Sequence, residues 1–235
     1  MRATFLVFLS ETRLFSDRVD GLLRGLGFAH GLGVGSVGRG GGLALLWRSE
    51  MEVRLESLDK MHIDVTFLDP LTREEKWRFT GFYGESRREL RYRSWECLQM
   101  LRGRSSLPWL CMGDFNEALH ESEHFGGAGR RENQMEGFRD AVDFCGFTDL
   151  GFIGLPYTWD NRQEGDHNVK VRLDRGLASD SFLDLYREVK VCMFKIHCRI
   201  IAVCWLNAWS IRQAGEEERI FDTRTCGSVT QATWL

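Results

Sequence analysis

The stretch "PWLCMGDFN", residues 108–116, joins an apolar run to a polar turn, and it decides how the rest of the chain is interpreted. The run WLCM has the composition of a buried strand, and Gly113 opens the turn. Such a strand delivers Asp114 and Asn116 at its carboxyl end, where a sheet exposes a site. An aspartate can ligate a hard metal or position water, and an asparagine can donate to a phosphate oxygen. Because Asx turns use the same residue types, support must come from elsewhere in the chain.

The composition indicates a globular protein with nearly balanced charge. The chain has 235 residues, 43% of them hydrophobic, with 8 Trp and 16 Phe, which is ample material for a packed core. Its 31 basic and 34 acidic residues give a net charge of -3, which argues against a global attraction to nucleic acid and leaves a local basic groove open. Seven cysteines without a C-x-x-C pair suggest a reducing compartment. No apolar run is long and uninterrupted enough to predict a membrane span or a signal peptide. We therefore expect an intracellular protein, nuclear or cytoplasmic and not secreted.

Hydrophobic patterning predicts many strands and few helices. Continuous apolar runs at 4–10 and 42–47 are typical of strands buried on both faces, and alternation predicts strands at 51–57, 62–68 and 76–84. Helical spacing predicts helices over 85–103 and 133–147, and a further strand is predicted over 169–179. The expected class is α/β (α+β), with two sheets packed face to face and helices outside. The domain is expected to span 1–206, followed by an appendage over 207–235 that lacks strong periodicity.

The segment "GVGSVG", with Gly33, Gly35 and Gly38, matches the dinucleotide-binding pattern letter for letter. That pattern requires a preceding strand and must open a helix whose N-terminus holds pyrophosphate. Here further glycines and then the strand-like "GLALLW" follow, so the sequence predicts a hairpin-type loop and no dinucleotide cofactor.

The segment "HESEH", residues 120–124, matches the zinc-protease pattern H-E-x-x-H. The zinc chemistry needs both histidines on one helical face, a third ligand downstream and Glu121 as the base. The segment has room for only about two helical turns before Gly126 and Gly127, and His167 and His197 are the downstream histidines. We interpret the motif as two solvated histidines on a short surface helix, and the zinc protease remains the least favoured alternative.

Three further polar residues lie at or inside apolar strands. Glu11 ends the first strand in "FLSETR", and Tyr83 ends "FTGFYG". Asp174 lies inside "VRLDRG", where a carboxylate costs free energy unless it has a partner, and a histidine is a natural one. Metal-dependent hydrolysis of a phosphodiester needs a Mg²⁺ ion held by a carboxylate and a positioned water. It also needs hydrogen-bond donors that stabilise the developing negative charge, and often a His–Asp pair. The chain supplies candidates for each part.

In order along the chain, the segments "LSETR", "GGLALLW", "FTGFYG", "CMGDFNE", "LPYTWDNR" and "VRLDRGLAS" resemble the endonuclease/exonuclease/phosphatase superfamily. They look most like the apurinic-type endonuclease domain of plant LINE (non-LTR) retrotransposons, over roughly residues 5–185. The resemblance implies a four-layer αββα sandwich of two mixed sheets flanked by helices. It also implies a phosphodiester hydrolase that uses Mg²⁺ (or Mn²⁺) and acts on DNA.

The same resemblance implies a role for each matching residue. Glu11 would bind the metal, and Tyr83 would be an aromatic group on the phosphate side. Asp114 would orient or activate the water, and Asn116 would stabilise the pentacovalent phosphorus. Asp174 would hold the catalytic histidine, whose best counterpart is His197 in "KIHCRII". Thr158 and Trp159 would lie at the substrate-facing rim, although Trp159 and Tyr83 are equally typical of plain sheet aromatics.

The chain departs from the family pattern at two places. Family members begin with a strand that bears a metal-site Asn and with a helix, whereas only ten residues precede Glu11 here. We expect the loss of that strand to expose a ladder edge on its neighbours. The family also closes with a Ser-Asp-His-like motif, and Ile196 stands where the Asp belongs. We therefore expect a truncated domain of weak or absent activity. The alternative is a non-catalytic nucleic-acid-binding or relict fragment, and the tail vaguely resembles the linker toward a reverse transcriptase.

Overall fold

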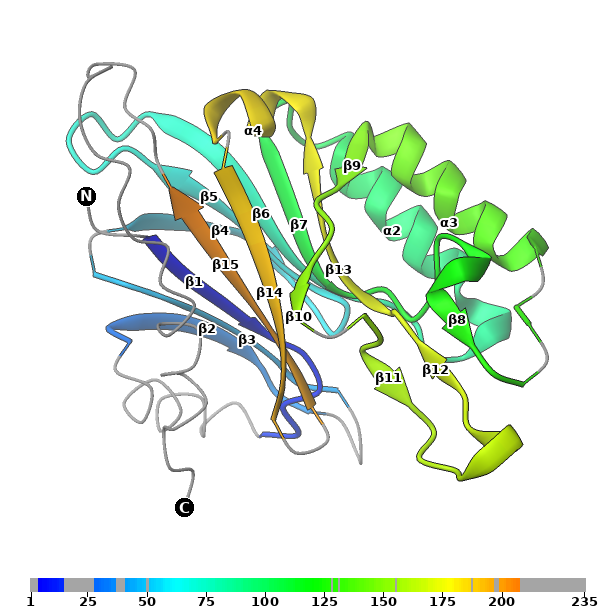
Figure 1. Cartoon of the computed structure of the whole chain (residues 1–235). Coiled ribbons are helices and arrows are strands. Elements are labelled where there is room, and N and C mark those ends of the chain that lie inside the picture. Colours follow the sequence, from blue (N-terminus) through cyan, green and yellow to red (C-terminus); the bar gives the residue numbers. More distant parts are fainter. Residues whose placement is uncertain are drawn as a thin grey trace.

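The computed structural model describes residues 4–14, 28–36, 41–49, 51–127, 129–130, 132–154, 156–186, 188–196 and 199–207. Two six-stranded sheets face each other, and a three-stranded sheet lies at one end of the molecule (Figure 1). The appendage expected over 207–235 lies almost wholly outside the described residues, which end at Asn207. No described helix is long and apolar enough to cross a membrane.

The first sheet has the strand order β10-β14-β15-β1-β3-β2. Its strands are β1 (Thr4–Leu9), β2 (His30–Val34), β3 (Leu43–Trp47), β10 (Ile153–Gly154), β14 (Glu188–Ile196) and β15 (Arg199–Asn207). The pair β10 and β14 is parallel, and all other pairs are antiparallel, so the sheet is mixed as expected. The hairpin β2–β3 contains Gly33, so "GVGSVG" leads into a hairpin and opens no described helix.

The second sheet has the order β4-β5-β6-β7-β13-β9 and is also mixed, because only β6 and β7 run parallel. Its strands are β4 (Glu52–Leu58), β5 (His62–Leu68), β6 (Glu75–Tyr83), β7 (Trp109–Asp114), β9 (Phe147–Asp149) and β13 (Asp174–Ser179). The small third sheet joins β8 (His124–Phe125), β11 (Trp159–Asp160) and β12 (Lys170–Val171). The predicted strand over 169–179 is thus divided between two sheets.

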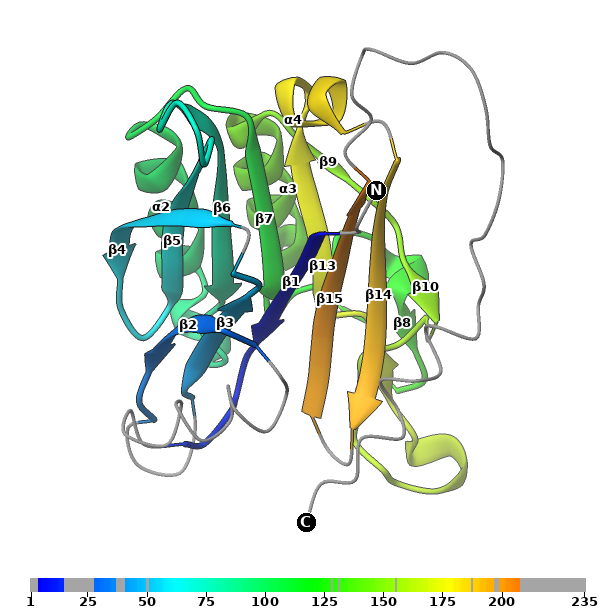
Figure 2. The same ribbon diagram turned by 90° about the vertical axis from the view of Figure 1, so that its left-hand side faces the viewer.

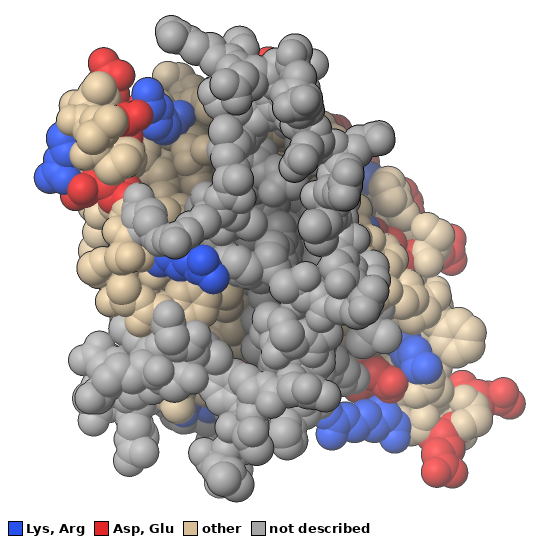
Figure 3. Space-filling view, turned by 60° about the vertical axis from the view of Figure 1, so that its left-hand side comes forward, with Lys and Arg blue, Asp and Glu red and all other residues tan. Residues whose placement is uncertain are grey.

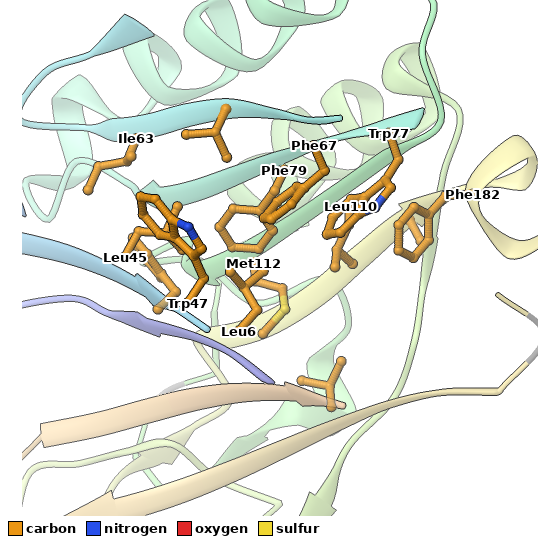
Figure 4. Packing of buried hydrophobic residues seen from close by; sticks show 14 of the residues in the cluster. Leu6, Leu45, Trp47, Ile63, Phe67, Trp77, Phe79, Leu110, Met112 and Phe182 are labelled. Carbon is orange, nitrogen blue, oxygen red and sulfur yellow. The ribbon is translucent and has the colours of Figure 1, made fainter. Parts of the chain in front are cut away.

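A hydrophobic core fills the space between the two large sheets (Figure 4). Leu6, Leu45 and Trp47 from the first sheet face Phe79 and Met112 of the second. All five side chains are buried, which is why the strands that carry them are apolar on this face. The strand runs recognised in the sequence therefore form the inner layer of a sandwich.

Helices cover the outer face of the second sheet (Figures 1 and 2). They are α2 (Tyr92–Arg102), which follows the 3-10 turn η2 (Arg88–Leu90), and α3 (Glu132–Cys145). The helical spacing of Met135, Phe138 and Val142 predicts an inward face on α3; all three are buried, and Gly146 ends the helix with φ 65°. A short helix, α4 (Asp180–Leu185), was not predicted; it inserts Phe182 into the core between the sheets. Within the described residues, helices cover only one of the two sheets, so three of the four expected layers are seen.

Strand β1 is paired along both edges, to β3 on one side and to β15 on the other. The expectation of an exposed ladder edge beside β1 is therefore wrong. The register pairs Leu9 with Ile201, so β15 covers the whole length of β1. Because each backbone group of a buried strand needs a partner, this pairing lets β1 be apolar on both faces.

Candidate active site

Three of the predicted site residues lie side by side at one edge of the second sheet. Asp114 ends β7 and is paired in register with Tyr83 at the end of β6 and with Asp174 at the start of β13. Glu11 follows β1 of the other sheet, and the Tyr83 hydroxyl donates a hydrogen bond of 2.7 Å to Glu11 Oε1. The structure therefore brings four candidates together from both sheets.

The turn after β7 is held by its own polar atoms. The backbone N–H of Asn116 donates to Asp114 Oδ1 at 2.8 Å, and the Asn116 amide Nδ2 donates to the carbonyl of Gly84 at 2.8 Å. Asn116 has φ 55° and Gly113 has φ 149°, conformations that favour Asn and Gly. The turn is thus an Asx turn that also fixes Asp114 against the end of β6.

Glu11 is held by a loop that the sequence analysis did not single out. Its φ is 52°, a left-handed conformation that costs a non-glycine residue free energy and is often found at functional sites. The next two residues fix this conformation, because Thr12 N donates to Gly42 O and Arg13 N donates to Gly41 O, both at 3.0 Å. In the sequence, the two glycines that begin "GGLALLW" were the available signal for this contact with the loop of Glu11.

The pKa values of Asp114 and Asp174 are raised, because these carboxyl groups are buried close to other acidic groups. Burial, together with the negative charges of Asp174 and Glu11, raises the pKa of the Asp114 carboxyl well above its usual value. Burial raises the pKa of Asp174 to about 6, the charge of Glu11 adds to the rise, and a hydrogen bond from Thr158 opposes it. Burial and the Glu11 carboxylate also raise the pKa of Tyr83, so its hydroxyl stays protonated and serves as a donor.

Asp174→Asn is expected to stabilise the chain at pH 8 by on the order of 1–3 kcal/mol, and to have no effect below about pH 4. With its pKa raised to about 6, folded Asp174 holds its proton more tightly than the unfolded chain does. Wild-type stability is therefore lost as the pH rises from about 4 to about 6, and the variant escapes this loss. Urea unfolding across pH measures the difference, and the exposed Asp143→Asn is the control. A variant less stable than wild type at pH 8 would contradict the expectation.

The donor chemistry of the site fits a hard divalent cation. Mg²⁺ is commonly held by one or two protein carboxylates, and waters and substrate phosphate oxygens complete its shell. Glu11 would hold the ion, and the like charges of Asp114 and Asp174 nearby would attract it. In the described part of the chain, no three His, Cys, Asp or Glu side chains lie close enough to form a metal cluster by themselves.

The remaining predicted residues lie around this centre. Thr158 is buried, and its Oγ1 accepts hydrogen bonds from the backbone N–H groups of Leu173 and Asp174 at 2.9 and 3.0 Å. Trp159 is 45% exposed on the small third sheet. His197 lies outside the described residues. The strands that flank it meet at Ile196 and Arg199, at the end of the first sheet where β1 also ends.

The residues of "HESEH" do not form the helix that a zinc protease requires. Glu121–Glu123 is a 3-10 turn, and His120 before it is extended, with φ -135°. The Glu123 carboxylate instead accepts from Arg172 Nη1 at 3.0 Å and from Arg175 Nη2 at 2.8 Å. The predicted short surface helix is therefore a tighter turn, and Glu123 serves the fold.

A buried ion pair beside the turn at Asp114 and Asn116 also escaped the sequence analysis. Glu117, one residue after Asn116, is 1% exposed, and its carboxylate binds Arg91 Nη1 at 2.6 Å and also binds Arg130. The helix predicted over 85–103 has an arginine-rich side, including Arg91, which predicts a solvated face. Because Arg91 precedes α2 and points to Glu117, it anchors the turn instead.

Comparison with known proteins identifies the family of this chain. Residues 2–189 match the Endonuclease/Exonuclease/phosphatase family. The chain therefore belongs to that family, and its fold is that of the family's phosphodiesterases, like nucleases and phosphatases. A comparison with curated proteins gives no match.

Solved structures with the same fold include nucleases and a phosphatase. The 3' phosphatase NExo from Neisseria, bound to a product DNA hairpin, is 16% identical over 86% of this chain and 88% of that chain, with a TM-score of 0.63. The AP endonuclease LMAP from Leishmania major is 16% identical over 86% and 78%, with a TM-score of 0.59. The endonuclease domain of TRAS1, a telomere-specific non-LTR retrotransposon, is 12% identical over 77% and 81%, with a TM-score of 0.57. At such identities the likeness shows the fold alone.

Proposed function

We propose that this chain is a metal-dependent phosphodiesterase domain that descends from the DNA endonuclease of a non-LTR retrotransposon, of the plant LINE type. The observation that carries the proposal is the meeting of Glu11, Tyr83, Asp114 and Asp174 at strand ends of both sheets. DNA as the substrate is supported by the NExo structure, which holds a DNA product, and by the fold shared with TRAS1.

Each side chain has a task in this proposal. Glu11 would hold a Mg²⁺ ion, which would stabilise negative charge on the phosphoryl oxygens. Tyr83 orients Glu11 through the hydrogen bond from its protonated hydroxyl. Asp114 takes the proton of the attacking water, and its raised pKa suits it to act as a base closer to neutral pH. The Asn116 amide gives one hydrogen to Gly84 O and keeps the second for a phosphate oxygen.

Asp174 completes the set by holding a histidine, for which His197 is the candidate. The side chain of Asp174 is buried, and its backbone N–H donates to Thr158 Oγ1 at 3.0 Å, which holds this residue in place. Ile196 replaces the acidic residue that precedes this histidine in the family pattern. Since one acid–base group contributes roughly 10²–10⁴ in rate, we propose that turnover is slow.

The test is nicking of supercoiled plasmid by the purified chain with Mg²⁺. Asp114→Ala is expected to lower the nicking rate by at least about 10²-fold, because it removes the general base. The matched control is Asp143→Ala, an exposed aspartate of α3, which should nick at the wild-type rate. Equal background from all three proteins would contradict the proposal and favour the non-catalytic fragment. That alternative predicts unchanged DNA affinity when Glu11 and Asp114 are neutralised, with no turnover to lose.

A further inference from the structure

A second group of catalytic residue types lies in the hairpin β4–β5, and none of its members belongs to the site described above. Ser57 Oγ lies 2.9 Å from His62 Nε2, and His62 Nδ1 lies 3.0 Å from Asp59 Oδ1. A hydroxyl, an imidazole and a carboxylate joined in this order have the arrangement of an activated serine nucleophile, its base and the group that orients the base. Both distances fall within hydrogen-bond reach.

The local backbone explains how a six-residue stretch brings these groups together. Leu55 is paired with Val65, and after a β-bulge at Glu56 the next pair is Ser57 with Asp64. The extra residue turns Ser57 from the face of Leu55 to the face of Asp64 and His62. The hairpin is then closed by a hydrogen bond of 2.9 Å from Asp59 N to His62 O. Without the bulge, Ser57 would point to the opposite side of the sheet from His62.

The hydrogen bonds around the group assign its protons. Arg104 Nη1 donates to Ser57 Oγ at 3.0 Å, so the hydroxyl hydrogen of Ser57 is free to point to His62 Nε2. Asp59 Oδ1 accepts from Met61 N at 2.7 Å and from the backbone N of His62 at 3.0 Å, and it also lies 3.0 Å from His62 Nδ1. Burial opposes ionisation of Asp59, but its hydrogen bonds outweigh burial and hold its pKa below the usual value. An ionised Asp59 fixes the tautomer in which Nε2 accepts the serine proton.

The neighbouring thiol does not take the nucleophile's place. Cys97 Sγ of α2 lies 3.8 Å from His62 Nδ1, the nitrogen that faces Asp59. Burial raises the pKa of the Cys97 thiol to about 12, so it stays neutral and inert as a nucleophile. Ser57 is only half-buried and is the nucleophile that a small molecule can reach.

We propose that Ser57, His62 and Asp59 form a serine-hydrolase-type site that is acylated by small activated carboxylic esters. Ser57 Oγ attacks the carbonyl carbon while His62 Nε2 takes the hydroxyl proton, and the oxyanion forms beside the Arg104 guanidinium. The bond to the leaving alcohol breaks as His62 returns the proton to that alcohol, which leaves an ester on Ser57. Water then attacks the acyl carbon, gives its proton to His62, and the acid departs as Ser57 Oγ takes the proton back.

The experiment is labelling of the full chain with a fluorophosphonate probe, with peptide mapping by mass spectrometry. Ser57 is expected to be labelled at least about 10²-fold faster than Ser105, the acceleration that a positioned base supplies. Ser105 is the matched control, because it is also half-buried and lies beside an arginine but contacts no histidine. Labelling of Ser57 no faster than Ser105 overturns the proposal, and this result needs no variant.

Variants distinguish the labelling of Ser57 from the plasmid nicking proposed for the phosphodiesterase site. Ser57→Ala is expected to abolish the fast label and leave plasmid nicking unchanged, whereas Asp114→Ala is expected to keep the label. Asp59→Asn disturbs the tautomer of His62 and is expected to slow labelling of Ser57 roughly tenfold or more. Because half of the Asp59 side chain is exposed, this variant should keep its fold, and a wild-type labelling rate in folded Asp59→Asn overturns the proposal.

Discussion

Gly113→Ala is expected to lower the free energy of unfolding by more than about 4 kcal/mol, a loss reached only by severe core changes. Gly113 has φ 149°, a conformation that costs a residue with a side chain roughly 1–3 kcal/mol. A Cβ at this position would also overlap the carbonyl oxygen of Phe82 on the neighbouring strand β6. Since β6 and β7 carry Tyr83 and Asp114, the strands would have to separate at the site, and nicking should be lost as well.

Gly103→Ala is the matched control for this prediction. Gly103 follows α2 with φ -68° and ψ -14°, and the nearest atom to a new Cβ is 3.5 Å away. Alanine should be tolerated there or should stabilise the chain slightly, because it restricts the unfolded state. Urea unfolding of both variants measures the difference. Equal stability of Gly113→Ala and wild type would mean that the turn before Asp114 has a different backbone.

Arg78→Met is expected to cost about 3–5 kcal/mol, because it strips the partner from a buried carboxylate. Arg78 and Asp64 are each 1% exposed. Two guanidinium nitrogens of Arg78 donate to Asp64 at 2.8 and 2.7 Å, a third donates to Leu101 O at 2.6 Å, and the group stacks over Trp109 at 4.7 Å. The measurement is the denaturant midpoint at constant slope.

Two comparisons identify the cause of that loss. The double variant Asp64→Leu/Arg78→Met removes both charges and should recover most of the stability, since apolar replacements of buried pairs are often neutral. Arg54→Met breaks an exposed pair with Glu75 and should leave the midpoint unchanged. If the double variant is no more stable than Arg78→Met, lost packing over Trp109 rather than the unpaired charge explains the effect.

The sequence predicted the position of a residue best where the signal lies within the residue's own strand or helix. The apolar runs located β1, β3 and β7, and the turn residues after them placed Glu11 and Asp114 at strand ends. The predicted helix over 133–147 was confirmed, because its apolar spacing and Gly146 are both local signals. The predicted helix over 85–103 begins later, at Tyr92, since a 3-10 turn comes first.

Features that depend on distant partners could not be predicted from the sequence. The alternation over 51–57 gives no sign of the irregular pairing that follows Leu55. Its strand pairs through a bulge, and only the partner strand defines that bulge. Arg91 gave the pattern of a solvated face because Glu117, its ion-pair partner, is 26 residues away. The pairing of β15 with β1 had no local signal, so the predicted open edge was wrong.

In the view of Figure 3, basic and acidic side chains lie close together at the upper left and at the lower right of the described surface.

The hydrogen bond from Tyr83 to Glu11 joins two sheets and residues 72 positions apart in the chain. A growing polypeptide cannot complete this site until β13 has been made and the two sheets have closed over their core. A nascent chain that ends before β13 therefore contains Glu11, Tyr83 and Asp114 but lacks Asp174 and the strand that pairs with β7.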